Sequence, residues 1–290
     1  MNISIIDKKD TTLSFCNNTI KFDDIKLPIR LTDAIIITSN VTIDTKELIK
    51  ITNSGVNFIF FNPFSNKTTI AMSAEQKNAD LKLKQYQALS KRLYIAKYII
   101  AEKIKRHTFQ LGINDIALEN SHYLEKLKQV KEIDELLGVE GSFSREYFGH
   151  YFSLFSKRLH SGKRTKRPPK DPLNALLSYF YTLLYSLLTV RLLANGFDPS
   201  ISYLHTPFRS HQALSSDMLE LFRDRVNQFV KIIIDEKIVE MEDFTKKNGG
   251  VYLRYSGRKK LYKPLKELWD GLGPNISKEI ANLRAIIEGK

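Results

Sequence analysis

Acids and a histidine in two neighbouring segments are the first candidates for chemistry. Asp217 and Glu220 stand three positions apart in SSDMLELFR (215–223), so on a helix both carboxylates would share one face, and Arg223 would continue it. His205 ends the turn-rich segment GFDPSISYLH shortly before. Carboxylates and imidazoles are the side chains that most often transfer protons or bind metal ions. A solvated acidic edge with one ion pair would have the same spacing, so the pattern alone leaves both interpretations open.

A further acid, Glu140, lies in LLGVEGSFSREYF (136–148), with Gly138 and Gly141 close to it on either side. Such glycines allow a close approach of the backbone. The six histidines of the chain form no recognised metal-binding spacing by themselves, and surface acids beside glycine are common. The case for a site is therefore weak for each residue alone.

Other kinds of site are excluded by the motifs that the chain lacks. No G-x-x-x-x-G-K-[ST], G-x-G-x-x-G, H-E-x-x-H or G-x-S-x-G sequence occurs. Cys16 is the single cysteine, which excludes a disulfide framework and a multi-cysteine metal site, and we interpret it as a bystander. Its isolation fits a reducing compartment, and no signal peptide is recognisable, so we expect a cytoplasmic protein.

The elements that must position these residues change in character near residue 75. Short apolar, β-branched runs predict strands before that point, with one helix over 45–53, and a helical period follows from residue 76. We therefore predict an α+β protein with a β-rich domain over 1–75 and an α-helical domain over 76–290. The predicted strands are 3–6, 12–15, 19–22, 34–38, 56–61 and 68–72; the predicted helices are 76–111, 121–138, 142–160, 172–194, 211–235 and 276–288.

The uncharged stretch 173–190 is long enough to prompt the question of a membrane span. Its polar residues recur every three or four positions and form one stripe, which a lipid-facing helix would not need. We predict a buried central helix whose polar face lines something, with Asp171 as N-cap and Asn195–Gly196 as its end.

The charge of the chain is concentrated in its second part. Of 290 residues, 45 are Lys or Arg and 32 are Asp or Glu, for a net charge of +13, while residues 1–75 are neutral overall. Two clusters, 157–170 and 254–266, contain basic residues and no acid. Nucleic acid is the expected partner, with binding that weakens steeply as salt rises. The expected contacts are Lys163, Arg164, Lys166, Arg167, Arg223, Arg258, Lys259 and Lys260.

Four ordered segments together resemble one protein family. VEGSFSREYF (139–148), RPPKDPLNALLSYFYTLLY (167–185), GFDPSISYLH (196–205) and SSDMLELFR (215–223) are similar to motifs of the CRISPR-associated endonuclease that acts as the integrase of spacer acquisition. The resemblance covers about 76–268 and depends little on the β-rich part. The chain departs from the family pattern at Phe180 and Tyr203, where Gly is frequent, and at Asp224, where Pro is usual.

The resemblance implies catalytic divalent-metal ligands at Glu140, His205 and Glu220, with Asp217 close to the metal. It implies Mg²⁺ or Mn²⁺ as the cofactor, and the nitrogen ligand favours Mn²⁺. The implied activity joins 3′-hydroxyl ends of short DNA fragments into the CRISPR repeat by transesterification. The implied partners are double-stranded DNA, a second copy of the chain held through the β-rich domain, and a small ferredoxin-like CRISPR-associated protein that completes a heterohexamer.

The alternative from a different class is a non-catalytic DNA-binding scaffold, whose composition and basic clusters would look the same. A scaffold has no need to keep Glu140, His205 and Glu220 together, so this set discriminates between the two. An RNA-binding regulator is disfavoured because no recognition motif of that kind occurs.

Overall fold

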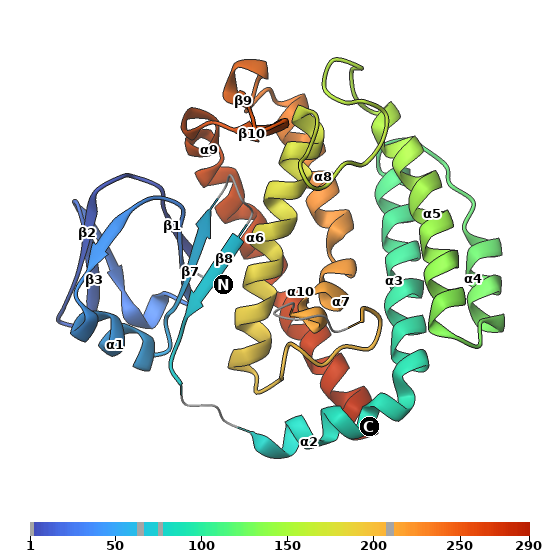
Figure 1. Cartoon of the computed structure of the whole chain (residues 1–290), viewed down its shortest axis with the longest axis horizontal. Coiled ribbons are helices and arrows are strands. Elements are labelled where there is room, and N and C mark those ends of the chain that lie inside the picture. Colours follow the sequence, from blue (N-terminus) through green and yellow to red (C-terminus); the bar gives the residue numbers. More distant parts are fainter. Residues whose placement is uncertain (1–2, 63–66, 75–77, 207–211) are drawn as a thin grey trace. The chain divides into compact units, whose positions relative to one another are not determined.

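The computed structural model describes residues 3–62, 67–74, 78–206 and 212–290 (Figure 1). The chain divides into two compact units. The first combines Met1–Lys77 with Arg254–Arg284, and the second combines Asn78–Leu253 with Ala285–Lys290. The first boundary falls beside the predicted one. The predicted division differs at the carboxyl end, where 254–284 group with the β-rich part, to which Arg258 is joined by an ion pair with Asp7.

The first unit contains two four-stranded sheets. In one sheet the order is β1-β5-β7-β8, with β1, β5 and β7 parallel and β8 antiparallel to β7. In the other the order is β4-β3-β2-β6. Their bounds are β1 Ile3–Ile6, β2 Thr11–Cys16, β3 Thr19–Phe22, β4 Ile25–Pro28, β5 Ala34–Ile37, β6 Val41–Ile43, β7 Asn57–Asn62 and β8 Lys67–Ala71.

Buried aliphatic and aromatic side chains hold this unit together. Ile35, Ile37 and Phe58 of the first sheet lie in one core cluster with Leu13 and Ile20 of the second. The six predicted strands are present. Strands β4 and β6 were not predicted, because β4 is a short, largely exposed strand that ends in a proline and β6 is only three residues long.

The first unit also contains helices. Helix α1 (Thr45–Asn53) is the predicted one, and Asp44 caps it by accepting a hydrogen bond from the Lys46 backbone N–H. Helix α10 begins well before the predicted residue 276, because prolines and glycines in its first half obscure the helical period. The remaining elements are the 3-10 helix η1 (Ile29–Leu31), α9 (Tyr255–Lys260) and α10 (Tyr262–Glu288).

The second unit is helical except for one hairpin. Helix α3 packs against α4, α5, α7 and α8, and α6 packs against α7 and α8 (Figure 1). The bounds are α2 Ala79–Gln87, η2 Ala88–Lys91, α3 Arg92–Gly112, α4 Ser121–Gln129, α5 Ile133–Ser153, α6 Pro172–Ala194, α7 Ala213–Glu220, α8 Arg223–Asp235, η3 Met241–Asp243, β9 Phe244–Lys247 and β10 Gly250–Leu253.

Four of the helices predicted in this unit differ from the structure in their bounds. The predicted helix 121–138 is interrupted at 130–132, between α4 and α5, and the predicted helix 142–160 ends at Ser153. The stretch 76–111 is interrupted by η2, and 211–235 is two helices separated at Leu221–Phe222. The break predicted between 138 and 142 is wrong, since α5 runs unbroken from Ile133 to Ser153. The β9–β10 hairpin was not predicted.

Helix α6 has the predicted ends and is the buried centre of its unit. Asp171 caps it by accepting from the Asn174 backbone N–H, and Pro172 occupies the first turn. The helix is long and apolar enough to cross a membrane, but 78% of its most apolar window is buried inside the protein. Its polar stripe is internally bonded: Tyr181 bonds Asn227 of α8, and Thr189 donates to Ser215 of α7 at 2.8 Å.

Candidate metal centre and cation-lined cavity

A buried carboxylate, Asp217, organises the segment that carries His205. Its Oδ2 accepts the backbone N–H groups of Tyr203 at 2.7 Å and Leu204 at 2.9 Å, and its Oδ1 accepts that of His205 at 2.9 Å. The same Oδ1 lies 2.8 Å from Nδ1 of His205. Because an ionised carboxylate only accepts, Nδ1 carries the proton, and Nε2 keeps a lone pair. This carboxylate–imidazole pairing is the arrangement that orients a metal-binding histidine.

Two side chains from α2 and α3 fix the same segment from its other side. Gln85 of α2 is fully buried and donates to the carbonyls of Asp198 and Ile201 at 2.8 and 3.0 Å. Arg92 of α3 donates to the Tyr203 carbonyl at 2.8 Å. The imidazole is therefore held by the backbone of a segment that is itself bonded on two sides.

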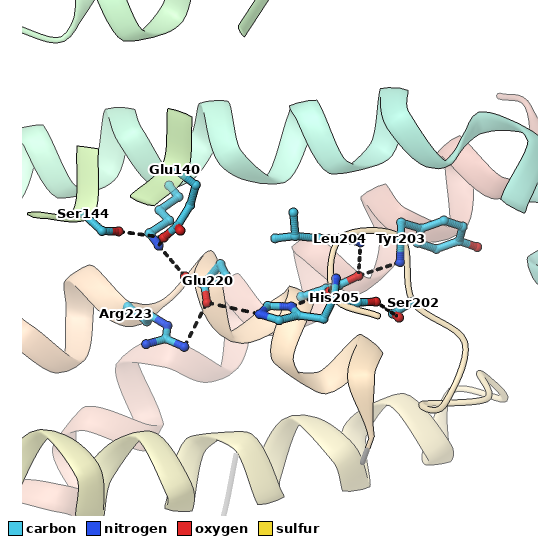
Figure 2. Close-up of polar contacts among 10 residues, drawn as sticks. Glu140, Ser144, Ser202, Tyr203, Leu204, His205, Glu220 and Arg223 are labelled. Carbon is cyan, nitrogen blue, oxygen red and sulfur yellow. Dashed lines mark hydrogen bonds and ion pairs between the residues drawn. The ribbon is translucent and has the colours of Figure 1, made fainter. Parts of the chain in front are cut away.

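The two other expected ligands meet at a buried lysine. Glu140 projects from α5 and Glu220 from the end of α7, on opposite sides of the site (Figure 2). Lys103 of α3 bonds Oε1 of Glu140 and lies 2.8 Å from Oε2 of Glu220. Ser144 donates to Oε1 of Glu140 at 2.6 Å. The structure thus brings Glu140, Glu220 and Asp217 to one place with His205, whose Nε2 is 4.0 Å from Oε1 of Glu220.

Positive neighbours keep the two glutamates ionised. Burial would raise the pKa of Glu220, but Arg223 at 2.9 Å and Lys103 outweigh it and hold that pKa well below its usual range. The pKa of Glu140 is also lowered, because Lys103 overcomes the effect of burial. In return, both carboxylates raise the pKa of Lys103 although its burial acts in the opposite direction. The cluster is therefore fully charged at neutral pH.

His107 lies beneath this cluster and stays neutral. It is buried on α3 one turn from Lys103, and the edge of its ring meets Tyr147 at 4.5 Å between centroids. Its Nδ1–H donates to the Lys103 carbonyl at 2.9 Å. Burial, followed by the charge of Lys103, lowers the pKa of His107 to about 3. The imidazole thus adds packing and no positive charge.

A cavity of about 460 Å³ opens from these carboxylates. Glu140, His205 and Glu220 line it together with Lys163, Arg164 and Lys166 of the basic segment 157–170. Desolvation, followed by repulsion from Arg223, lowers the pKa of Lys166. A cavity in which cations outnumber acids favours a polyanion over a neutral ligand.

The basic segment 157–170 contains no helix or strand, and side-chain hydrogen bonds join it to α6. Arg164 donates to Oδ1 of Asn174 at 2.9 Å and to the Ser178 hydroxyl at 3.1 Å. Ser161 donates to Asp171 at 2.9 Å through its hydroxyl. Two nitrogens of the Arg164 guanidinium are therefore bonded within the protein while the residue still lines the cavity, and its contact with DNA stays a prediction. Lys163, Lys166 and Arg167 remain exposed.

The expected DNA contacts at 258–260 belong to the first unit and line no part of this cavity. Arg258 is 6% exposed, and its guanidinium bonds Asp7 at 2.9 and 3.1 Å. It is therefore an internal ion pair and not a surface contact, whereas Lys259 and Lys260 are exposed.

The glycines beside Glu140 do not serve a close backbone approach. A Cβ at Gly138 or Gly141 would have no described heavy atom within 4 Å, and Gly141 lines the cavity. They leave open space next to Glu140.

Lys103 is the functional residue that the sequence analysis missed. The sequence did contain an indication of its role. Lys103 lies one turn from Ile99 and Ile100 on the apolar face of α3, and a charge buried there needs a partner of opposite charge. Its partners are Glu140, 37 positions away, and Glu220, farther still along the chain, so no local pattern could name them.

The donor types fit the divalent cation that the resemblance implies. Glu140 and Glu220 offer carboxylate oxygens, and Asp217 leaves Nε2 of His205 available. Among the described residues no three His, Cys, Asp or Glu side chains gather closely enough to hold an ion, and the ammonium of Lys103 contacts both glutamates instead. The position between the glutamates thus already holds one positive charge.

Comparison with known proteins places this geometry in a family. The family model described as CRISPR associated protein Cas1 matches residues 3–267. The chain is 35% identical over 291 residues to "CRISPR-associated endonuclease Cas1 1" of Thermodesulfovibrio yellowstonii, covering 93% of this chain and 91% of the relative.

Solved structures share the fold. A Cas1 protein from Thermotoga maritima has a TM-score of 0.91 at 23% identity, covering 100% of this chain and 98% of the other. A casposase bound to integration product has a TM-score of 0.87 at 21% identity, covering 99% and 90%. A Cas6-RT-Cas1–Cas2 complex has a TM-score of 0.80 at 19% identity, covering 99% and 35%. By the extent of the family match and the identity to its curated relative, this chain belongs to the CRISPR-associated Cas1 family.

Proposed function

We propose that this chain is a divalent-metal-dependent DNA endonuclease and integrase of CRISPR adaptation. The observation that carries the proposal is the meeting of Glu140, Glu220 and the Asp217-oriented His205 at the end of a cation-rich cavity. The naming of the curated relative as an endonuclease, and a structural neighbour bound to an integration product, support the reaction class.

The proposed reaction exchanges one phosphodiester bond for another. The 3′-oxygen of a short DNA fragment attacks a phosphorus at the edge of the CRISPR repeat and loses its proton to solvent. The bond from that phosphorus to the 3′-oxygen of the neighbouring nucleotide breaks, and this leaving oxygen takes up a proton. The number of phosphodiester bonds is unchanged, so the protein needs no nucleophile of its own. In hydrolysis, water replaces the attacking 3′-hydroxyl.

When bound, the divalent ion supplies Lewis-acid polarisation of the phosphate, and Glu140, Glu220 and Nε2 of His205 would hold it. The other groups of the chain have separate tasks. Asp217 keeps the proton of His205 on Nδ1, and Arg223 keeps Glu220 ionised. Lys166 and Lys163 present ammonium groups to phosphate oxygens at the mouth of the cavity. The cations also favour the extra negative charge of the transition state.

The proposed partners follow the same family assignment. Double-stranded DNA is the substrate, and the neutral charge of residues 1–75 suits a protein-facing surface through which two copies associate. The neighbour that contains Cas1 and Cas2 supports a small ferredoxin-like partner, with which we propose a heterohexamer in the prokaryotic cytoplasm.

A joining assay tests the proposal. The purified chain, with and without its small partner, is mixed with labelled short duplexes and a repeat-bearing plasmid in Mn²⁺, beside Glu140→Ala and an EDTA control. We expect label joined to the plasmid only for the unmodified chain with metal. Glu125→Ala, an exposed acid of α4, is the matched control and should join normally.

Two other outcomes have defined meanings. Joining that survives Glu140→Ala would refute the assignment of Glu140 to the metal. DNA binding with neither joining nor cleavage under any condition would refute the enzyme and favour the scaffold.

A further inference from the structure

A second cavity, of about 870 Å³, lies within the first unit at the carboxyl ends of its parallel strands. Strands β1, β5 and β7 are aligned with Ile6 opposite Ile37 and Ile37 opposite Phe60. The chain after β1 (7–9), the chain after β5 (38–40) and the end of β7 all line the cavity. In open sheets with parallel strands, ligands bind in the crevice outside these carboxyl ends.

Thr38 lines this cavity and carries a buried hydroxyl without a partner among the described residues. Thr38 is 8% exposed, and its Oγ1 has no hydrogen-bond partner among the described residues. The backbone N–H of Thr38 donates a hydrogen bond to the Ile6 carbonyl at 2.9 Å, which fixes the backbone at Thr38. Buried hydroxyls nearly always have a partner because leaving one unmet is unfavourable. Because Thr38 lines the cavity, its unsatisfied hydroxyl is the group there that most needs a polar partner.

One wall of the cavity offers a rigidly mounted aromatic face. Arg258 of α9 is held by Asp7, and both side chains are buried. Tyr255, one turn earlier, lies against that guanidinium with 5.8 Å between Cζ and the ring centroid. Its side chain is nevertheless 46% exposed. A mounted, half-exposed ring that lines a cavity is suited to stacking on a flat ligand.

The rim of the cavity is cationic. Lys8 and Lys9 both line it. Lys8 pairs with Asp23 at 2.9 Å, but both groups are substantially exposed, so this pair is easily exchanged. Asp7 is neutralised by Arg258. The net charge available to a ligand at this edge is therefore positive.

We propose that this cavity binds a nucleoside phosphate, either as a free nucleotide or as the end of a single DNA strand. The base would stack on Tyr255, the phosphate would lie at Lys8 and Lys9, and a polar atom of the ligand would bond Thr38 Oγ1. The volume lies within the range of about 300–1,000 Å³ that is usual for small-ligand sites. This site is independent of the proposed nuclease centre, which shares no residue with it.

Binding is tested by calorimetry on the full chain carrying Glu140→Ala, in EDTA, so that neither metal nor cleavage contributes. The probes are dAMP, inorganic phosphate and a 5′-phosphorylated oligothymidylate of five nucleotides. We expect dAMP or the oligonucleotide to bind, and Thr38→Val and Tyr255→Ala each to weaken binding at least fivefold. Lys26→Ala, an exposed lysine of β4 outside the cavity, is the matched control and should bind normally.

The two sources of the ligand are separated by the probes. Binding of dAMP as tight as that of the oligonucleotide indicates a free nucleotide, and binding of the oligonucleotide alone indicates a strand end. Thermal melting of Thr38→Val, expected at or above the parent temperature, establishes that the variant is folded. The proposal is overturned if neither nucleotide probe binds, if phosphate alone binds equally well, or if folded Thr38→Val and Tyr255→Ala both bind like the parent.

Discussion

Asp217 holds His205 at two atoms of the same residue: one carboxylate oxygen accepts both its backbone N–H and its Nδ1–H. The position of the imidazole and the identity of its free nitrogen therefore depend on a single acid. This makes Asp217 a positioning residue. It acts through His205, and its other carboxylate oxygen accepts hydrogen bonds from the backbone N–H groups of Tyr203 and Leu204.

Asp217→Asn should weaken Mn²⁺ binding about 10- to 100-fold, the usual effect of losing an outer partner of a metal-binding histidine. The NH₂ group of the amide is a donor and cannot accept a hydrogen bond. Whichever of Nδ1 and the backbone N–H groups faces it therefore loses its acceptor. Electron paramagnetic resonance of free Mn²⁺ measures the affinity. Asp235→Asn, an exposed acid at the end of α8, is the control. An unchanged affinity in Asp217→Asn would remove Asp217 from this role.

Lys103→Met should destabilise the metal-free protein by about 3–5 kcal/mol, because it leaves Glu140 and Glu220 facing each other without their shared cation. Mn²⁺ should then raise the melting temperature more in the variant than in the parent, since a ligand that binds only the folded state stabilises it. Differential scanning calorimetry with and without Mn²⁺ measures both effects.

The control is Lys105→Met, two residues along α3, whose ammonium is exposed and pairs with Glu102 at 3.0 Å. It should change stability by less than about 1 kcal/mol. Equal melting of Lys103→Met and Lys105→Met, with the same response to Mn²⁺, would contradict the role given to the buried lysine.

Asp224→Asn should stabilise the protein at pH 7–8 and not near pH 4. Burial raises the pKa of Asp224 to about 6, and its Oδ1 has no hydrogen-bond partner among the described residues. The folded state therefore retains a proton that the unfolded chain has lost between its usual pKa, near 4, and 6. Above pH 6 the folded state carries the cost of a buried charge, at most about 3 kcal/mol, which the amide removes.

Urea unfolding of the parent and Asp224→Asn from pH 4 to 8 measures this difference, which should grow from pH 4 to about pH 6 and level off above it. A constant difference across that range would show that the carboxylate is not desolvated as its position indicates.

Exposed and internal basic residues of 157–170 should behave differently toward DNA. Lys163→Ala and Arg167→Ala should each lower the slope of log affinity against log salt by up to about 0.9 for duplex DNA, if each neutralises one phosphate. Arg164→Met should instead lower the unfolding free energy, because Asn174 and Ser178 lose their buried partner. Fluorescence anisotropy at several salt concentrations and urea unfolding separate the two. Equal effects on both measurements for all three variants would refute the distinction.

The sequence predicted the bounds of an element well wherever capping or helix-ending residues mark both of its ends. Helix α6 matches its predicted bounds because Asp171–Pro172 and Asn195–Gly196 mark both ends. The prediction failed at α5, which runs without interruption through the break predicted between 138 and 142, although Gly138 and Gly141 lie there. Helix breakers indicate a preference, and tertiary contacts can outweigh it.

The candidate site was predictable through motifs but its internal partners were not. Glu140, His205 and Glu220 line one cavity and Asp217 bonds His205, yet the contacts of these residues depend on long-range partners. Their role as metal ligands stays a prediction. Lys103 joins acids from two other helices, and Gln85 bonds a segment more than a hundred residues away. Such contacts follow from the arrangement of helices and leave no periodic trace in the sequence.

The bonds between 157–170 and α6 have a thermodynamic consequence for an incoming strand. Ser161 and Arg164 tie this segment down at two points, so much of its conformational entropy is lost when the protein folds. Lys163 and Lys166 therefore belong to a segment that is already ordered in the free protein. DNA that binds them does not have to pay the entropy cost of ordering that segment. Removing the hydrogen bonds that order the segment would lower the affinity for DNA even if every positive charge were kept.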